Sequence, residues 1–136
     1  MSRLDVTTAT DLNDAIARAK DAVDRSAGDA RGRYITVVPG QAETYTAKAL
    51  EAERFLADPA PDMAKYPMIS AEMQAMGYPD GTSAANAILT VRAQWMALGA
   101  QIEQIRLKAK RDIEAATTIQ QVAQIRHAAV QQLEGL

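Results

Sequence analysis

The sequence predicts an all-α protein, a helical bundle with two long helices, shorter middle helices and one extended connector. Three observations lead to this prediction. Apolar residues towards both ends of the chain recur at spacings of three and four, the period of one helix face. Aromatic residues make up only 4% of the chain, against 48% apolar residues in all, so alanine and aliphatic side chains must form the core. The helix-interrupting prolines all lie in the middle of the chain, at Pro39, Pro59, Pro61, Pro67 and Pro79.

Length and composition limit the possible functions. The 136 residues suit one structural unit, which we divide into an N-terminal helical arm (1–30) and a helical bundle module (31–136). With no cysteine and one histidine, the chain has no disulfide, thiolate ligand or multi-histidine metal site. A net charge of -2 argues against a nucleic-acid binder. The polar start and the lack of a long apolar stretch predict a soluble protein with no membrane partner, made in the cytoplasm.

The first helix is predicted from one apolar stripe. Its members are spaced four, three and four residues apart, and they are Leu12, Ile16, Ala19 and Val23. Thr10 is expected to cap the start of this helix, and Gly28 to end it with a left-handed turn. The β-prone run 33–38 follows, ended by Pro39. It is either an extended connector or a strand that pairs with another chain, and we favour the connector.

The middle of the chain predicts two helices and a turn. Residues 41–57 are helical by composition, and a short helix begins at Pro67, where a proline is well tolerated, and stops at Gly77. Residues 78–81 read as a tight turn in which Gly81 permits a positive φ. Four methionines in this region suit either core packing, the commoner use, or a tolerant binding surface.

The C-terminal half predicts a long helix and a final shorter one. The long helix begins at Thr82 or Ser83 and, if continuous to Ala116, is about 45–50 Å long. It carries an apolar heptad repeat, which we call the heptad seam and expect to be an oligomer or packing surface: Ile88, Val91, Trp95, Leu98, Ile102 and Ile105. Thr118 and Gln121 resemble a capping box that opens a separate last helix, although a bend at this junction is the alternative.

No pattern in the sequence indicates catalysis, so we expect no catalytic residue, cofactor or metal. His127 lies off the apolar stripe of its helix and reads as a solvated side chain. The acidic residues Glu51, Glu53 and Glu72 have no spacing typical of a glycosidase or a metal site. The densest basic cluster is Arg106, Lys108, Lys110 and Arg111. Nearby acidic residues at helical spacing predict a salt-bridged face there, with a protein or nucleic-acid contact as the alternatives.

A resemblance to a known group of proteins rests on five segments. These are RGRYIT (31–36), PGQ (39–41), YTAKALEA (45–52), YPMISAE (66–72) and WMALGAQIEQIRL (95–107). Their arrangement is similar to small helical proteins and modules encoded among the tail and tail-fibre genes of bacteriophages. The resemblance covers about three-quarters of the chain. It brings no catalytic residue with it.

The resemblance implies a non-enzymatic virion protein, a structural or adaptor part of the tail, tail fibre or baseplate. Its partners would be itself, as a dimer or trimer, and other tail proteins. We expect such partners to contact Tyr34, Ile35, Val37, Tyr66 and Met68. The alternatives are a tail-fibre assembly chaperone, absent from mature particles, and a regulator or inhibitor that binds a host protein.

Overall fold

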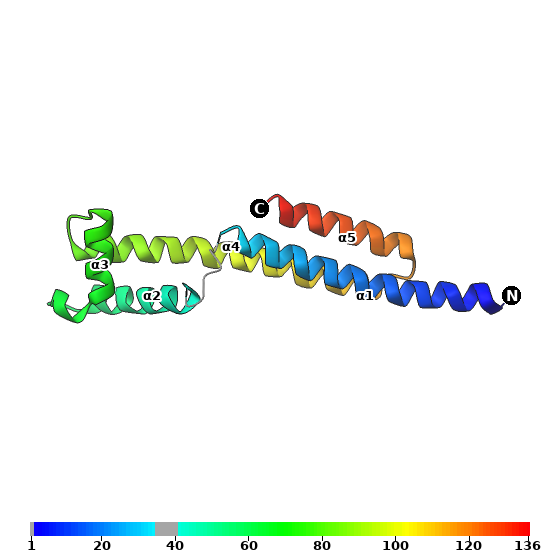
Figure 1. The fold of residues 1–136 in the computed structure, drawn as a ribbon, viewed down its shortest axis with the longest axis horizontal. Helices are drawn as coiled ribbons and strands as arrows, with labels where there is room; N and C mark the ends of the chain where they lie inside the picture. Colours follow the sequence, from blue (N-terminus) through cyan, green and yellow to red (C-terminus); the bar gives the residue numbers. More distant parts are fainter. Residues whose placement is uncertain (1, 35–40) are drawn as a thin grey trace. The chain divides into compact units, whose positions relative to one another are not determined.

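The computed structural model describes residues 2–34 and 41–136, with side chains from Asp11 to Tyr34 and from Ala42 onward. Within these ranges the chain is all-helical and contains no strand, which confirms the predicted fold class. Figure 1 shows the helices in order along the chain. They are α1 (Ser2–Gly32), α2 (Gln41–Ala57), a 3-10 helix (Met63–Lys65), α3 (Pro67–Met76), α4 (Gly81–Ala115) and α5 (Ile119–Glu134).

The chain forms two compact units. Residues 1–35 and 98–136 make up the first, called here the terminal unit, and residues 36–97 make up the second, the central unit. Helix α4 contributes to both, because residues 81–97 belong to the central unit and 98–115 to the terminal unit. This division differs from the one drawn from the sequence, 1–30 and 31–136. The reason is that α1 packs against the C-terminal half of the chain and so shares a core with it.

The terminal unit is a three-helix arrangement in which α5 lies beside α1 (Figure 1). Its core is rich in alanine, a small residue that lets helices approach closely. Each of the three helices contributes to the buried cluster, which consists of Ala19, Val23, Ala27, Ala30, Ile102, Ala109, Ile113, Val122, Ala129 and Leu133. The predicted stripe of the first helix therefore faces this core, with Leu12 and Ile16 packed at its edge.

The central unit has a smaller core, which α2, α3 and the first part of α4 enclose. The buried residues are Ala52, Phe55, Tyr66, Ile69, Ala84, Ala85 and Ile88. The rings of Phe55 and Tyr66 meet edge to face, with centroids 5.1 Å apart, a favoured geometry for aromatic pairs. Met63 and Met73 pack against this cluster, so two of the four methionines in the middle of the chain serve the core.

Several predicted helix boundaries are confirmed. Helix α3 begins at Pro67 and ends at Met76, where Gly77 caps it with a φ of 72° in the left-handed region. Helices α4 and α5 are separate, and the hydroxyl of Thr118 accepts a hydrogen bond from the backbone N–H of Gln121 at 3.1 Å. The Gln121 side chain reaches back to the N–H of Thr117 at 2.9 Å, so the capping box is present with its return bond shifted by one residue.

The predicted limits of the first helix are wrong. Thr10 and Gly28 both lie inside α1, which runs from Ser2 to Gly32. Beyond Gly28, the buried Ala30 still packs in the terminal core. This tertiary packing carries the helix past a residue that disfavours it by only about 1 kcal/mol relative to alanine.

The predicted role of Gly81 is also wrong. It is the first residue of α4, and the only positive φ among the glycines of the described residues belongs to Gly77. The side chain of Asp80 accepts a hydrogen bond from the N–H of Ser83 at 2.7 Å and so caps the helix. Gly81 is needed for space, since a Cβ there would lie 2.5 Å from Cζ of the buried Phe55.

Two glycine-to-alanine variants should therefore change stability in opposite directions. Gly81→Ala should lower the free energy of unfolding by about 1–3 kcal/mol, because the Phe55 ring must move in a packed core. In Gly28→Ala no atom lies within 4 Å of the new Cβ. This variant should raise the free energy of unfolding by about 0.5–1 kcal/mol, because alanine has a higher helix propensity than glycine. Urea unfolding followed by circular dichroism measures both. Equal effects of the two variants would contradict the close approach at Gly81.

Two other predictions concern the extended connector and the lack of a membrane-spanning helix. Arg33 and Tyr34 form a turn after α1, whereas the rest of the predicted connector, residues 35–38, lies outside the described residues. Across the described part of the chain, no helix combines the length and apolar character that crossing a membrane requires.

Candidate functional site

The basic cluster predicted from the sequence lies on α4 within the terminal unit, where it faces acidic residues of α1. The carboxylate of Asp24 forms ion pairs with the guanidinium of Arg106 and with the ammonium of Lys110, each at 2.9 Å. Arg31 of α1 contacts Glu103 of α4 at 2.8 Å. These contacts and the Lys20–Glu114 pair form an ionic ladder between α1 and α4.

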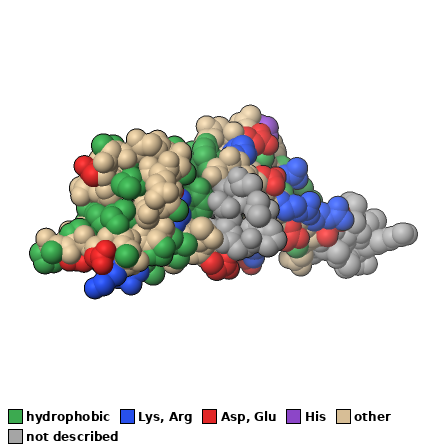
Figure 2. Space-filling model, turned by 60° about the vertical axis from the view of Figure 1, so that its left-hand side comes forward, with side chains coloured by type: hydrophobic (Ala, Val, Ile, Leu, Met, Phe, Trp, Pro, Cys, Tyr) green, Lys and Arg blue, Asp and Glu red, His purple; other side chains and the backbone are tan. Residues whose placement is uncertain are grey.

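The predicted salt-bridged face is confirmed. Arg106 pairs with Glu103 and Lys108 pairs with Asp112 within α4, at helical spacings of three and four. The face of the molecule in Figure 2 likewise shows Lys and Arg side chains next to Asp and Glu side chains. Sequence reasoning missed Asp24, because it precedes Arg106 by 82 positions and only tertiary packing brings them together.

The ladder changes the acidity of its members. The hydrogen bond from Lys110, followed by that from Arg106, lowers the pKa of Asp24. The hydrogen bond from Arg106 lowers the pKa of Glu103, and the contacts of Arg106 with Glu103 and Asp24 raise its own pKa. Both carboxylates are therefore held in the charged form that the ladder requires.

This ladder should make the terminal unit sensitive to acid. Because the folded-state pKa values of Asp24 and Glu103 are lowered, their contribution to stability is present at neutral pH. This contribution begins to fall at about pH 4, near the pKa of these carboxyl groups in the unfolded chain. It is gone once the pH is below their lowered folded-state pKa values. We expect Asp24→Asn to be less stable than the unmodified protein at pH 7, with the difference shrinking towards pH 3. The midpoint of urea unfolding against pH measures this, with Asp21→Asn, exposed on the same helix, as the control. A difference independent of pH would contradict it.

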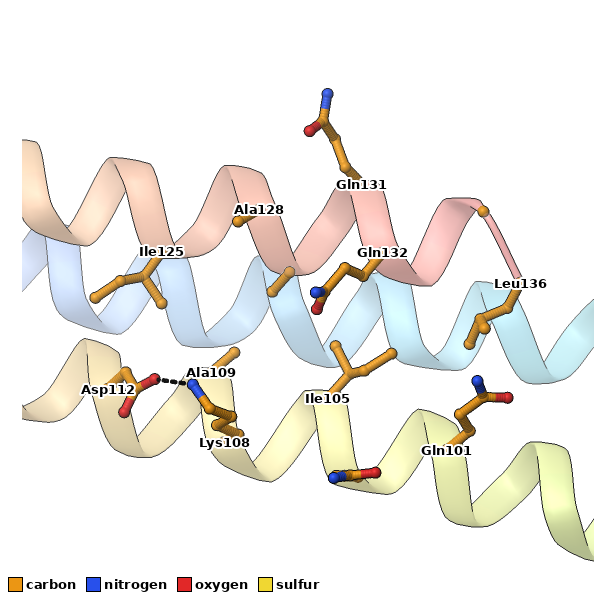
Figure 3. Close-up of a pocket in the computed structure, with 13 residues that line it drawn as sticks. Gln101, Ile105, Lys108, Ala109, Asp112, Ile125, Ala128, Gln131, Gln132 and Leu136 are labelled. Carbon is orange, nitrogen blue, oxygen red and sulfur yellow. Dashed lines mark hydrogen bonds and ion pairs between the residues drawn. The ribbon is translucent and has the colours of Figure 1, made fainter.

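A surface groove of the terminal unit lies between α4 and α5, with a volume of about 650 Å³. Its apolar residues come from both helices and include the half-buried Ile105 and Ile125. Figure 3 shows these two side chains in the space between the helices, with α1 behind them. Ala109, Ala128, Ala129 and Leu136 complete the apolar part of the groove.

The rest of the groove is polar but carries no net charge. It is lined by four glutamines, Gln101, Gln104, Gln131 and Gln132, and by one ion pair. That pair joins Lys108 Nζ to Asp112 Oδ2 at 2.9 Å and is drawn as the dashed line in Figure 3. The apolar part of such a groove can receive the apolar face of another helix.

The structure distributes the heptad seam between the two units. Ile88 is buried in the central core, and Ile102, 1% exposed, is buried in the terminal core. Leu98 and Ile105 are half-buried against the terminal core. In the central unit, Val91 is 40% exposed, and Trp95 is half-buried against Tyr45 with ring centroids 4.7 Å apart.

The five predicted partner contacts lie in different environments. Tyr34 is exposed at the end of α1 and Met68 is half-buried in α3, whereas Ile35 and Val37 lie outside the described residues. Tyr66 is buried in the central core, and its hydroxyl donates a hydrogen bond to Asp58 at 2.7 Å. This bond lowers the pKa of Asp58 and raises that of Tyr66.

The remaining candidate side chains are placed as follows. His127 is exposed on α5, Glu53 is exposed and pairs with Arg92, and Glu72 pairs with Lys48 at 2.8 Å. Glu51 is only 4% exposed, and its carboxylate accepts a hydrogen bond from the N–H of Ile69 at 2.7 Å. Among the side chains that the structure describes, in residues 11–34 and 42–136, no three His, Asp or Glu gather closely enough to hold a metal ion.

Glu51, like Asp24, has a specific structural role that sequence reasoning missed. It extends from α2 to the first turn of α3, whose N-cap residue Tyr66 makes no side-chain capping bond. The carboxylate of Glu51 therefore caps α3, although it comes from another helix: it accepts a hydrogen bond from an N–H of the first turn. Its negative charge also interacts favourably with the positive end of the helix dipole.

Comparisons with protein-family models, with curated proteins and with solved structures found no match to this chain.

Proposed function

We propose that this chain is a non-enzymatic structural or adaptor protein that acts by helix packing and oligomerisation. One observation carries the proposal, the groove between α4 and α5 of the terminal unit. Its apolar floor is open along both helices, and a further helix packed there would remove Ile105 and Ile125 from water.

Exposed apolar side chains support the same proposal. Met96 and Met76 are 61% and 63% exposed, and Leu50 and Leu107 are 53% and 54% exposed. Single exposed apolar residues are common on protein surfaces, but these four all lie on helices, where a partner helix can cover them. The basic cluster, by contrast, is occupied by acidic partners of the same chain, which leaves it a poor match for a phosphate backbone.

We place this function in the virion of a bacteriophage, in the tail, tail fibre or baseplate. The support is the resemblance of the chain from Arg31 onward to helical proteins of tail gene clusters. An all-α chain that offers helical surfaces is compatible with that role.

Mass spectrometry of purified particles tests this placement. The particles come from a lysate that expresses the chain, and the control is a lysate in which its gene is deleted. We expect the chain at a constant ratio to the tail proteins through successive purification steps. Absence from particles that nevertheless need it for assembly would indicate a chaperone instead. Absence from particles that form normally without it would indicate a regulator of a host protein.

A further inference from the structure

The polar side chains of the α4–α5 groove in one copy of the chain can pair with the same side chains in a second copy. The amides of Gln101 and Gln132, which point into the groove in Figure 3, each both donate and accept hydrogen bonds, and the positive charge of Lys108 is balanced by Asp112. A strongly acidic or basic partner would find no net opposite charge in this groove. A second groove of the same kind offers an acceptor for every donor and an anion for every cation.

We infer that a second copy of this chain covers the groove between α4 and α5, an inference that rests on the proposed function. A symmetric dimer uses the same surface on both copies, and such a surface must be self-complementary. The groove meets this requirement through its glutamines, its balanced ion pair and an apolar floor that the two copies can bury together.

The ion pair gives the dimer its specific contacts. Lys108 and Asp112 lie one helical turn apart on α4, and the Lys108 side chain is 66% exposed. When two α4 helices meet in opposite directions, Lys108 of each copy comes opposite Asp112 of the other. The two pairs within the helices are then exchanged for two pairs between the copies.

A steric variant with a matched control tests the surface. Ala128 is exposed on the groove side of α5, whereas Ala123 is exposed on the side of α5 that faces α1. Size-exclusion chromatography with light scattering on the full chain should give twice the mass of 14.7 kDa for the unmodified protein and for Ala123→Arg. Ala128→Arg should run as a monomer, with an unchanged helical circular dichroism spectrum that shows it to be folded.

A charge exchange tests the pairing itself. Lys108→Glu places only negative charges on both grooves of a dimer, and Asp112→Lys only positive ones, so each variant alone should be monomeric. A mixture of the two should form a heterodimer, because each groove then meets opposite charges. Native mass spectrometry separates the mixed species from the two parents.

Three results would overturn the inference. They are a monomeric unmodified protein at tens of micromolar, a dimer that Ala128→Arg leaves intact, and a mixture of the charge variants that stays monomeric. A monomeric protein would also remove self-association from the proposed function, but it would leave the structural or adaptor role in the particle intact, because a monomer found in purified particles would still be a part of them. Conversely, a dimer that is absent from particles would preserve this inference and remove the virion placement.

Discussion

Ile102→Asp is expected to unfold the terminal unit. Ile102 is 1% exposed in the core formed by α1, α4 and α5, and no Lys or Arg is among the buried residues of the described side chains. A carboxylate there would be buried without a partner, and the core would lose an isoleucine as well. We expect a loss of more than about 4 kcal/mol, which is comparable to the whole stability of many small domains. Thermal melting by circular dichroism and hydrogen exchange in α1 and α5 measure this loss.

Leu107→Asp is the matched control for this variant. Leu107 lies five residues further along α4 and is 54% exposed, so an aspartate there stays in water. Its effect should be within about 1 kcal/mol. If Ile102→Asp melts like Leu107→Asp, the core of the terminal unit is not where the structure places it.

Glu51→Leu is expected to release α3 from the central unit. The variant removes the acceptor of the Ile69 N–H and leaves that donor buried without a partner. The loss of a charged hydrogen bond of this kind costs about 2–3 kcal/mol. Hydrogen exchange should accelerate first in α3, because its N-terminal turn has no local side-chain cap to replace Glu51.

Two further variants separate the capping role of Glu51 from a general charge effect. Glu51→Gln keeps an oxygen acceptor without the charge and should lose less stability than Glu51→Leu. Glu53→Leu, two residues along α2, removes only an exposed pair with Arg92 and should change stability by about 1 kcal/mol or less. Unchanged exchange in α3 of Glu51→Leu would show that the carboxylate does not hold this helix.

The positions of most helices could be predicted because their signals are local. Pro67 and Gly77 bound α3, and Thr118 with Gln121 opens α5, through contacts that span only a few residues. The failures at Thr10, Gly28 and Gly81 have the opposite cause. Each of these residues has a reasonable local use, as a cap, a terminator or a turn, but α1 continues through Thr10 and Gly28, and Phe55 requires a small residue at 81.

The surfaces were harder to predict than the helices. Heptad spacing identified Ile88 and Ile102 as apolar positions of one face of α4, but it could not show that they enter two different cores. The partners of Arg106 and the groove beside Lys108 depend on which helices lie next to α4. A periodic pattern predicts which face of a helix is apolar, but it does not say which other element packs against that face.

The sequence by itself determined that this chain is all-helical, where most of its helices begin and end, and that its basic cluster carries ion pairs. Proline placement, apolar period and capping residues act within a few positions, so they can be read without a fold. Only the tertiary structure decided the division into two units, the capping of α3 by Glu51, the ladder to Asp24 and the groove between α4 and α5. Each of these joins residues far apart along the chain, and it is the packing of cores that selects which of the many possible distant contacts form.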